Sequence, residues 1–493
     1  MLAFDLRRFR RDERRESYPP VQSSGKRTIR ALVPFSPRSG LLTAAILSIA
    51  VVAVPRARAD TEARFFGDTS CGKSACHGGA VPSNPPHTGC RDVPSSWKWA
   101  WTQWRNKRVD HHSRSYETLL RPESQAIGRY MQINPTQSEK CLVCHAPAAT
   151  AMPGGNYQRK DGVTCEHCHG GSEFWKEAHS QSDWKQKKPE FLAKGFYDNA
   201  NFRLRAEKCA QCHVEIDHEI LAGGHPPLQF EMVAYAQLMK HWNDSEDRPS
   251  SPDCADPTLW SIGQLVGLRH AASMIAERAG DSDYQSLGKS PHFRDRNCYN
   301  CHHKLVEDGL RQARGHFAMS EIVLSVLLPG EKASLSSAWE QLVAAAGSDA
   351  ASAERRAGEL SAAAAEYSRR LASRSVTRSE AQMLLSRITS GASTLKQVRR
   401  FSHSSSPSSN VESVDEVNLP WWYTAGTPEQ TVLSIQALCT PAFDLMGGTR
   451  CSGGKGIDPD LGKLIDATDR FRYDPAEFSR LLSEIHRKLF AGE

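Results

Sequence analysis

One five-residue pattern, Cys-x-x-Cys-His, constrains this chain of 493 residues more than any other feature of its sequence. It occurs four times, at residues 141–145, 165–169, 209–213 and 298–302. With 14 Cys and 19 His in the chain, chance would produce far fewer than one such match. Two cysteines at this spacing can each form a thioether with one vinyl group of a haem, and the histidine that follows then binds the iron. The repeats therefore predict several covalently attached haems.

A fifth candidate lies upstream, where Cys71 and Cys76 enclose four residues and His77 follows directly. This loop is wider, but it still ends in Cys-His. The sequence Cys-His-Gly-Gly at residues 76–79 also repeats residues 168–171. We therefore expect five haems of the c type in total.

Ten cysteines and five proximal histidines are assigned to these haems. The predicted attachment residues are Cys71, Cys76, Cys141, Cys144, Cys165, Cys168, Cys209, Cys212, Cys298 and Cys301. The predicted proximal iron ligands are His77, His145, His169, His213 and His302. A pair of zinc ribbons is the structural alternative, because cysteine pairs at this spacing also bind Zn²⁺. Zinc does not require a histidine directly after every second cysteine, so the pattern favours haem.

The distal ligands decide whether a haem carries electrons or also binds a substrate, because a second strong ligand blocks the open face of the iron. His225 is the first candidate, since it lies in a rigid Gly-Gly-His-Pro-Pro turn just after a motif. His112 and His179 follow, each beside a haem segment and near aromatic residues, and then His218, His111 and His303. His167, inside a motif, is not expected to bind its own haem, because the loop directs it away. Mostly bis-His coordination is expected.

The first 59 residues have the composition of an export signal. They carry 12 basic and four acidic residues, and an apolar run at residues 41–54 precedes Ala57-Arg58-Ala59. The run is shorter than the roughly 20 residues of a spanning helix, and a small-x-small sequence is typical of a signal-peptide cleavage site. We expect cleavage after Ala59 and a periplasmic protein, with membrane attachment only if the signal stays uncleaved as an anchor.

Removal of residues 1–59 leaves 50 basic and 52 acidic residues. A balance so close to neutral gives no reason to expect a nucleic-acid partner. Cysteine usage agrees with an oxidising compartment. Four cysteines remain after the haem pairs, and three pairings are open to them. Cys439 with Cys451, which flank a Gly-rich loop, is the pairing considered first, leaving Cys90 for Cys254.

Several motifs in the same order resemble the multihaem cytochrome c-554 family, also described as the cytochrome c-552/4 domain. The resemblance covers about residues 60–305 and rests on Trp97, His112-Ser113-Arg114-Ser115-Tyr116, the motifs at 141–145 and 165–169 with Gly162-Val163-Thr164, Asp217-His218-Glu219, and Gly224-His225-Pro226-Pro227. Family members are periplasmic electron carriers with closely stacked haems that are mainly bis-His ligated. The resemblance implies distal roles for His112, His179 and His225. The wide first motif and a long helical extension depart from the family pattern.

The predicted fold is mainly α: a multihaem cytochrome c module with long loops, followed by a helical C-terminal extension. The expected organisation is a signal peptide (1–59), the multihaem domain (60–305), a helical region (306–401), a Ser-rich linker (402–415) and a C-terminal helical region (416–493). Amphipathic helices are expected at 228–242, 259–279 and 475–490, and helical spacing runs through 317–400. The extension is expected to cap one face of the haem module or to dock a partner.

The predicted function is electron transfer by a periplasmic pentahaem cytochrome, more in keeping with a carrier than an enzyme, so no catalytic residue is assigned. Its partners would be redox proteins or quinol-linked electron donors. The alternative is a multihaem oxidoreductase that acts on a small nitrogen or sulfur compound at one five-coordinate haem. The pentahaem nitrite-reducing form of that alternative uses Cys-x-x-Cys-Lys, and this sequence does not occur in the chain.

Overall fold

The computed structural model describes the parts of the chain that carry three of the predicted haem motifs and most of the helical extension. These are residues 63–71, 111–147, 157–214, 216, 218–226, 228–239, 256–280, 310–346, 349–390, 396–401, 414–419, 427–439, 442–443, 451, 456–468 and 475–490. All of them belong to one compact unit, Thr61–Glu493. The fold is mainly α-helical, as predicted. No helix within these residues is both long and apolar enough to cross a membrane.

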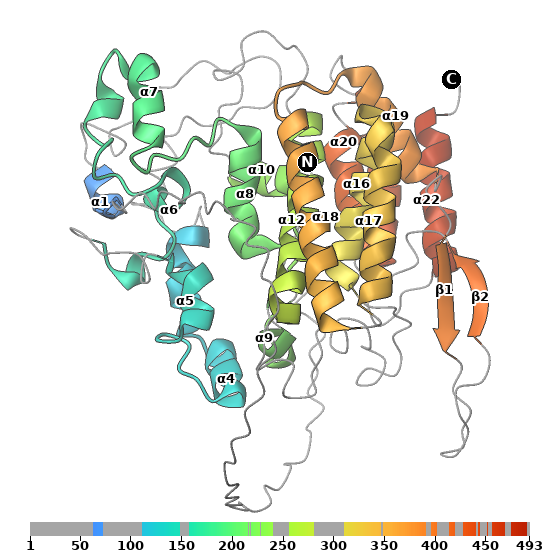
Figure 1. Cartoon of the computed structure of the whole chain (residues 1–493), viewed down its shortest axis with the longest axis horizontal. Helices are drawn as coiled ribbons and strands as arrows, with labels where there is room; N and C mark the ends of the chain where they lie inside the picture. Colours follow the sequence, from blue (N-terminus) through green and yellow to red (C-terminus); the bar gives the residue numbers. More distant parts are fainter. Residues whose placement is uncertain are drawn as a thin grey trace, which may run out of the picture. The chain divides into compact units, whose positions relative to one another are not determined.

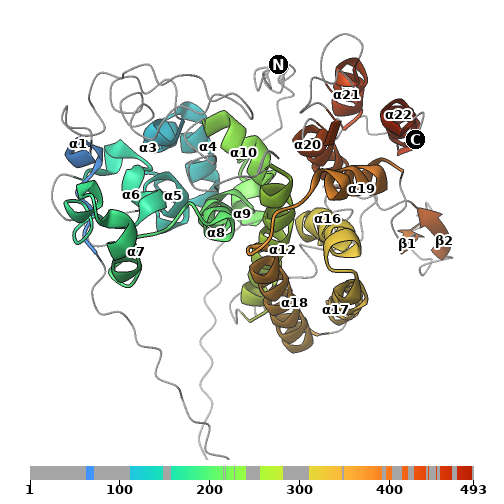
Figure 2. The same ribbon diagram turned by 90° about the horizontal axis from the view of Figure 1, so that it is seen from above.

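A bundle of helices forms the main hydrophobic core, and α12 (Asp256–Gly280) lies at its centre. Pro257 falls in the first turn of α12, where its missing N–H costs no hydrogen bond. The helix buries side chains on all sides, including Trp260, Leu265 and Leu268, as expected of a helix that is apolar all round. It packs against α8, α10, α16, α18 and α20, and Figures 1 and 2 both show α18 lying along it.

The remaining bundle helices follow α12 in sequence. They are α16 (Arg311–Leu327), η6 (Pro329–Glu331), α17 (Lys332–Ala345), α18 (Ala350–Leu371), α19 (Arg378–Thr389), α20 (Thr427–Cys439), α21 (Asp458–Asp466) and α22 (Pro475–Phe490). Side-chain caps fix two helix starts. Asp349 accepts from the Ser352 amide at 2.7 Å before α18, and Thr377 forms a capping box with Glu380 before α19. The predicted terminal helix at 475–490 has the bounds observed for α22.

Short helices joined by turns make up the part of the chain that carries the haem motifs. They are α1 (Asp68–Cys71), η2 (His111–Arg114), α3 (Ser115–Leu119), α4 (Pro122–Met131), α5 (Glu139–His145), η4 (Arg159–Asp161), α6 (Cys165–His169), η5 (Ala178–Ser180), α7 (Trp184–Leu192), α8 (Phe202–His213), α9 (His218–Ala222) and α10 (Met232–Met239). Helix α8 joins this part to the bundle, because it contacts α5 and also packs against α12 (Figure 1).

The contact between α8 and α12 is built on the buried carboxylate of Glu207. It accepts a hydrogen bond from His270 Nε2 at 2.9 Å and pairs with the Arg269 guanidinium. Arg203, one turn earlier on α8, lies 3.5 Å from the other carboxylate oxygen. Since Glu207 precedes the motif cysteine Cys209 by two residues, this charged cluster ties a haem motif directly to the central helix of the bundle.

Two boundaries differ from the sequence-based predictions. The helix predicted at 228–242 begins only at Met232, because the Glu231 carboxylate accepts from the amides of Val233 and Ala234 and caps the helix there. Residues 396–401, predicted as the end of the helical region, form a strand. Residues 414–419, predicted as the end of the linker and the start of the C-terminal helical region, form a second strand. Strands β1 (Lys396–Phe401) and β2 (Val414–Leu419) pair antiparallel, with Val398 opposite Val417. Helical spacing within one segment cannot reveal such pairing across the predicted linker, of which residues 402–413 lie outside the described residues.

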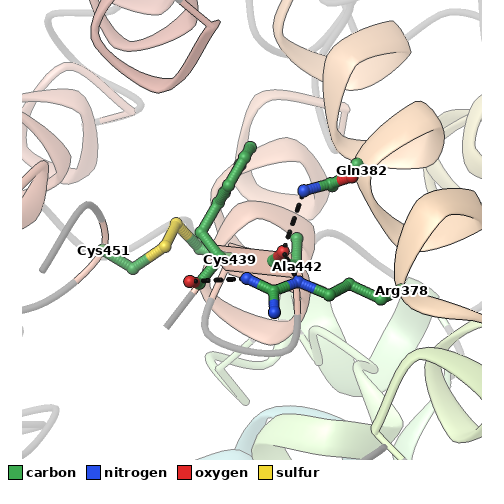
Figure 3. The surroundings of a disulfide bond; sticks show 6 residues. Arg378, Gln382, Cys439, Ala442 and Cys451 are labelled. Atoms are coloured by element: carbon green, nitrogen blue, oxygen red, sulfur yellow. Dashed lines mark hydrogen bonds between the residues drawn. A yellow bond between two sulfur atoms is a disulfide. The ribbon is translucent and has the colours of Figure 1, made fainter. Parts of the chain in front are cut away.

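The predicted disulfide between Cys439 and Cys451 is present, with a sequence separation of 12 residues. The carbonyl oxygen of Ala442, three residues after Cys439, accepts hydrogen bonds from Arg378 Nε at 2.9 Å and Gln382 Nε2 at 3.2 Å (Figure 3). The disulfide and these bonds together fix the end of α20 against α19. Cys90 and Cys254 lie outside the described residues, so their pairing stays a prediction.

The domain boundaries stay predictions as well. Helix α12 belongs in sequence to the predicted multihaem domain, yet its side chains share one core cluster with those of α16 and α18. The haem-bearing part and the helical extension therefore meet within a common core.

Candidate haem-binding site

Three of the four Cys-x-x-Cys-His motifs lie at the ends of helices. The motif histidine is the last residue of α5, of α6 and of α8. In each helix the two cysteines and the histidine occupy positions i, i+3 and i+4, which share one helix face. All six cysteines are of intermediate exposure. One turn of helix therefore presents two thiols and one imidazole on a single side, as covalent haem attachment requires.

The motif histidine of α5, His145, lies close to His225, the first-ranked candidate for a distal ligand. The imidazole ring centres of His145 and His225 are 6.4 Å apart. His145 Nδ1 donates to the carbonyl oxygen of Ser115 at 2.8 Å, and His225 Nδ1 donates to that of Pro226 at 2.7 Å. A carbonyl oxygen only accepts, so Nδ1 carries the proton in both rings and Nε2 keeps the lone pair that binds a metal. Metal-binding histidines usually have this second contact.

A second pair joins the motif histidine of α8 to another predicted distal ligand. The ring centres of His112 and His213 are 5.9 Å apart. An iron held between two imidazole nitrogens at about 2 Å each leaves the ring centres roughly 6 Å apart. Both observed separations agree with this value, so the two histidine pairs fit an axially ligated haem iron. The structure thus brings together His112 with His213 and His145 with His225.

Burial favours the neutral form of the two motif histidines, His145 and His213, and a metal binds a neutral imidazole. The pKa of His213 is lowered to about 4, mainly by burial and to a smaller extent by the nearby His112 and His145. Burial also lowers the pKa of His145, against the opposing effect of its hydrogen bond to Ser115. The ring of Tyr235 covers His213, with ring centres 4.6 Å apart.

The motifs of α5 and α8 meet at their cysteines. The thiols of Cys144 and Cys212 share a hydrogen bond, which raises the pKa of Cys144 and lowers that of Cys212. Cys212 Sγ also lies 4.0 Å from the carbonyl oxygen of Val143, which belongs to the loop between Cys141 and Cys144. These two predicted attachment sites are therefore adjacent in space.

The motif of α6 is held by a chain of polar contacts from α8. Asn199 Nδ2 donates to the carbonyl oxygen of Cys168 at 2.7 Å and lies 3.5 Å from His169 Nδ1. The buried Arg205 of α8 donates from Nε to the Asn199 carbonyl oxygen at 2.8 Å.

Within the Cys-x-x-Cys-His motif of α6, His167 Nδ1 accepts from the Thr164 amide at 2.6 Å. The His167 proton is therefore on Nε2, so that nitrogen has no lone pair for a metal.

His179 lies in an aromatic cluster, with ring centres 5.4 Å from Trp175 and 6.2 Å from Trp184. Its Nδ1 contacts the carbonyl oxygen of Lys176, which directs Nε2 away from the backbone. The distal role of His179 stays a prediction. His218 is the first residue of α9, and its role also stays a prediction.

Five predicted site residues lie outside the described residues: Cys76, His77, Cys298, Cys301 and His302. Cys71 is the last residue of α1, which contacts α6. Within the residues described, no group of three or more His, Cys, Asp or Glu is arranged to hold a metal ion.

Ser115 has a role that the sequence analysis missed. Its carbonyl oxygen accepts from His145 Nδ1, and its hydroxyl donates to the His145 carbonyl oxygen at 2.8 Å. The same hydroxyl accepts from the Val163 amide at 3.0 Å. Gly162 must be a glycine here, because its φ is +68° and a Cβ would lie 2.6 Å from Ser115 Oγ. Ser115 thus connects the motif of α5 to the segment just before the motif of α6. The spacing of the motifs in sequence does not indicate this contact.

Helix-terminal Cys-x-x-Cys-His motifs, two of whose histidines lie close to a histidine of another segment, are typical of c-type cytochromes. The model of the family described as cytochrome c554 and c-prime matches residues 97–170. That segment includes His112 and the motifs of α5 and α6, and it is a cytochrome c-554 family domain, which binds haem c covalently. The comparisons found no similar curated protein and no similar solved structure.

Proposed function

We propose that this chain is an exported, periplasmic cytochrome with five c-type haems that transfers single electrons between redox partners. The observation that carries the proposal is the pair of histidine contacts described above. His145 with His225, and His112 with His213, have ring separations of 6.4 and 5.9 Å. Each pair joins one motif histidine to one histidine from a different segment, which supports two axial ligands per iron.

Haem supplies one-electron chemistry, since its iron alternates between the ferric and ferrous states. The protein contributes the axial ligands, the burial of the rings and the covalent attachment. The backbone carbonyls of Ser115 and Pro226 fix the tautomers of His145 and His225. Two strong ligands leave no open coordination position for a substrate, which favours an electron carrier over an oxidoreductase.

The N-terminal sequence supports export. The basic residues, the apolar run at 41–54 and the small-x-small site ending at Ala59 are the parts of a secretory signal peptide. The partners of this chain would be redox proteins or quinol-linked electron donors. The disulfide between Cys439 and Cys451 agrees with an oxidising compartment.

Intact-mass spectrometry of the exported protein tests both parts of the proposal. We expect a mature N-terminus at Asp60 and the added mass of five haems. Electron paramagnetic resonance should then show low-spin haem only, and the reduced protein should not bind carbon monoxide. A mass equal to that of the bare polypeptide would refute the proposal. A high-spin signal with carbon monoxide binding would instead favour the oxidoreductase.

A further inference from the structure

Glu166 is a buried carboxylate inside a haem motif, between Cys165 and Cys168. Glu166 as a whole is 1% exposed. The carboxylate accepts hydrogen bonds from the amides of Phe66 at 2.8 Å, Gly67 at 2.7 Å and Ser172 at 2.9 Å. An ionised carboxylate is costly to bury unless donors surround it, and charge-assisted bonds to backbone amides are among the stronger ones. Glu166 therefore anchors a segment about 100 residues earlier in the chain.

The other residue inside the same motif contacts the same segment. The ring centre of His167 lies 5.2 Å from that of Phe65 and 5.7 Å from that of Tyr157. The bond from the Thr164 amide to His167 Nδ1 holds the ring in place. Both variable positions of the motif are thus used to hold residues 65–67.

The backbone of this segment also lies directly against the chain that follows α6. A Cβ added to Gly171 would lie 2.1 Å from the Ala63 carbonyl oxygen, so only glycine allows this approach. At the exposed rim, Arg64 pairs with Glu173 through its Nε at 2.7 Å. The docking of residues 63–67 therefore rests on close backbone contact and on Glu166, with a surface ion pair added.

The docked segment leads straight into the first predicted motif. Helix α1 begins one residue after Gly67 and ends at Cys71, and it contacts α6. Ser70 Oγ donates to the Gly67 carbonyl oxygen at 2.8 Å and lies 3.7 Å from Cys71 Sγ. Fixing residues 66 and 67 therefore fixes the position of Cys71.

We propose that Glu166 and His167 are positioning residues for the first motif, which hold Cys71 beside the attachment site of α6. A haem attached at Cys71 would then lie beside one attached at Cys165 and Cys168. This inference rests on the haem attachment proposed above. The wide spacing of the first motif is compensated by docking its leading segment onto another motif.

The charge of Glu166 has a second consequence for the same two haems. Ferric haem carries one more positive charge than ferrous haem, and a buried negative charge stabilises the ferric state because the interior screens it weakly. Glu166 thereby lowers the reduction potential of the haems nearest to it. Neutralising this side chain should raise that potential.

The full-length exported holoprotein tests the proposal in three forms: Glu166→Gln, Phe65→Leu and the control Glu173→Gln. Glu173 contacts the same segment but lies at the rim. Hydrogen exchange at Phe66 and Gly67 should become about tenfold faster or more in Glu166→Gln, since their acceptor weakens. Spectroelectrochemical titration should show a higher potential for one or two haems. Phe65→Leu should speed exchange with no charge effect on the potential, and Glu173→Gln should change neither.

Unchanged exchange and unchanged potentials in Glu166→Gln would overturn the proposal. Retained protection in α12 shows that each variant is folded. An intact mass with only four haems in the unsubstituted protein would refute the attachment at Cys71 and with it the predicted haem pair. Because exchange at Phe66 and Gly67 is measured independently, the docking role of Glu166 would still be decided.

Discussion

The imidazole rings of His145 and His225 lie with their centres 6.4 Å apart and their planes at 71°, and each ring donates its Nδ1 proton to a backbone carbonyl. His145 is the last residue of α5, and His225 follows α9 in a turn that begins with Gly223 and Gly224. Gly224 has a φ of +105°, a conformation that favours glycine. The turn therefore places one histidine of the chain opposite a motif histidine some 80 residues away.

Replacing His225 by alanine should convert one low-spin haem to the high-spin state. The substitution removes one of the two opposed imidazoles and leaves the thioether cysteines and His145 in place. Electron paramagnetic resonance and the visible absorption spectrum measure the change, and intact mass checks that the haem count stays the same. A spectrum identical to that of the unsubstituted protein would show that His225 is not an iron ligand.

Two adjacent histidines of η2 provide a matched pair of variants. His112 opposes His213 at 5.9 Å, whereas His111 is an exposed residue whose Nδ1 lies 3.2 Å from Arg114 Nη2. We expect His112→Ala to produce one high-spin haem and to allow carbon monoxide binding after reduction. His111→Ala should keep the parent spectrum. If both variants behave alike, the ring contact between His112 and His213 does not reflect shared iron ligation.

Motif spacing was enough to predict the haem attachment motifs, because covalent haem attachment depends on residues that are close together in sequence. Two cysteines and a histidine within five residues need no tertiary information, and the rigid Gly-Gly-His-Pro-Pro turn marked His225. The helical extension was predicted for a similar reason, since the apolar spacing of Leu360, Ala364 and Tyr367 lies within α18 itself, where all three are buried.

Contacts between distant segments were beyond such reasoning. The opposing of His112 and His213, the bonds of Ser115 and the docking of residues 65–67 on Glu166 all join segments 30 to 101 residues apart. A glutamate inside a Cys-x-x-Cys loop looks like any solvent-facing residue in sequence. The strand pair was missed for the same reason, because Val398 finds its partner, Val417, only in the folded chain.

Glu207→Gln should destabilise the contact between α8 and α12. Its carboxylate side chain is 8% exposed and pairs with Arg269 and His270. The amide keeps the shape but loses the charge, so the Arg269 guanidinium is left without its anion, at a cost of about 1–3 kcal/mol in the free energy of unfolding. Denaturant titration followed by circular dichroism measures this cost. Glu366→Gln, at a half-exposed pair with Arg369, is the control and should change the free energy little.

His316→Gln should weaken the loss of stability in acid. His316 on α16 is fully enclosed by Phe230, Gln264 and Gly267, and its Nδ1 lies 3.4 Å from Gln264 Oε1. The pKa of His316 is lowered to about 4, mainly by burial and to a smaller extent by the nearby His270, whose own pKa is also lowered to about 4 mainly by burial. The unfolded chain binds these protons near pH 6.5, so the folded state should lose stability as the pH falls from 6.5 toward 4.

Each such histidine contributes a slope of up to about 1.4 kcal/mol per pH unit within that window. A glutamine at position 316 can still form a hydrogen bond with Gln264 but does not titrate. The pH dependence of stability in this variant should therefore lack the contribution of about one proton from His316 and keep that of His270. Thermal midpoints measured by far-ultraviolet circular dichroism at pH 7, 6 and 5 give both slopes. Parallel curves for the two proteins would mean that His316 has the same pKa in the folded and the unfolded chain, and that its burial does not hold the ring neutral.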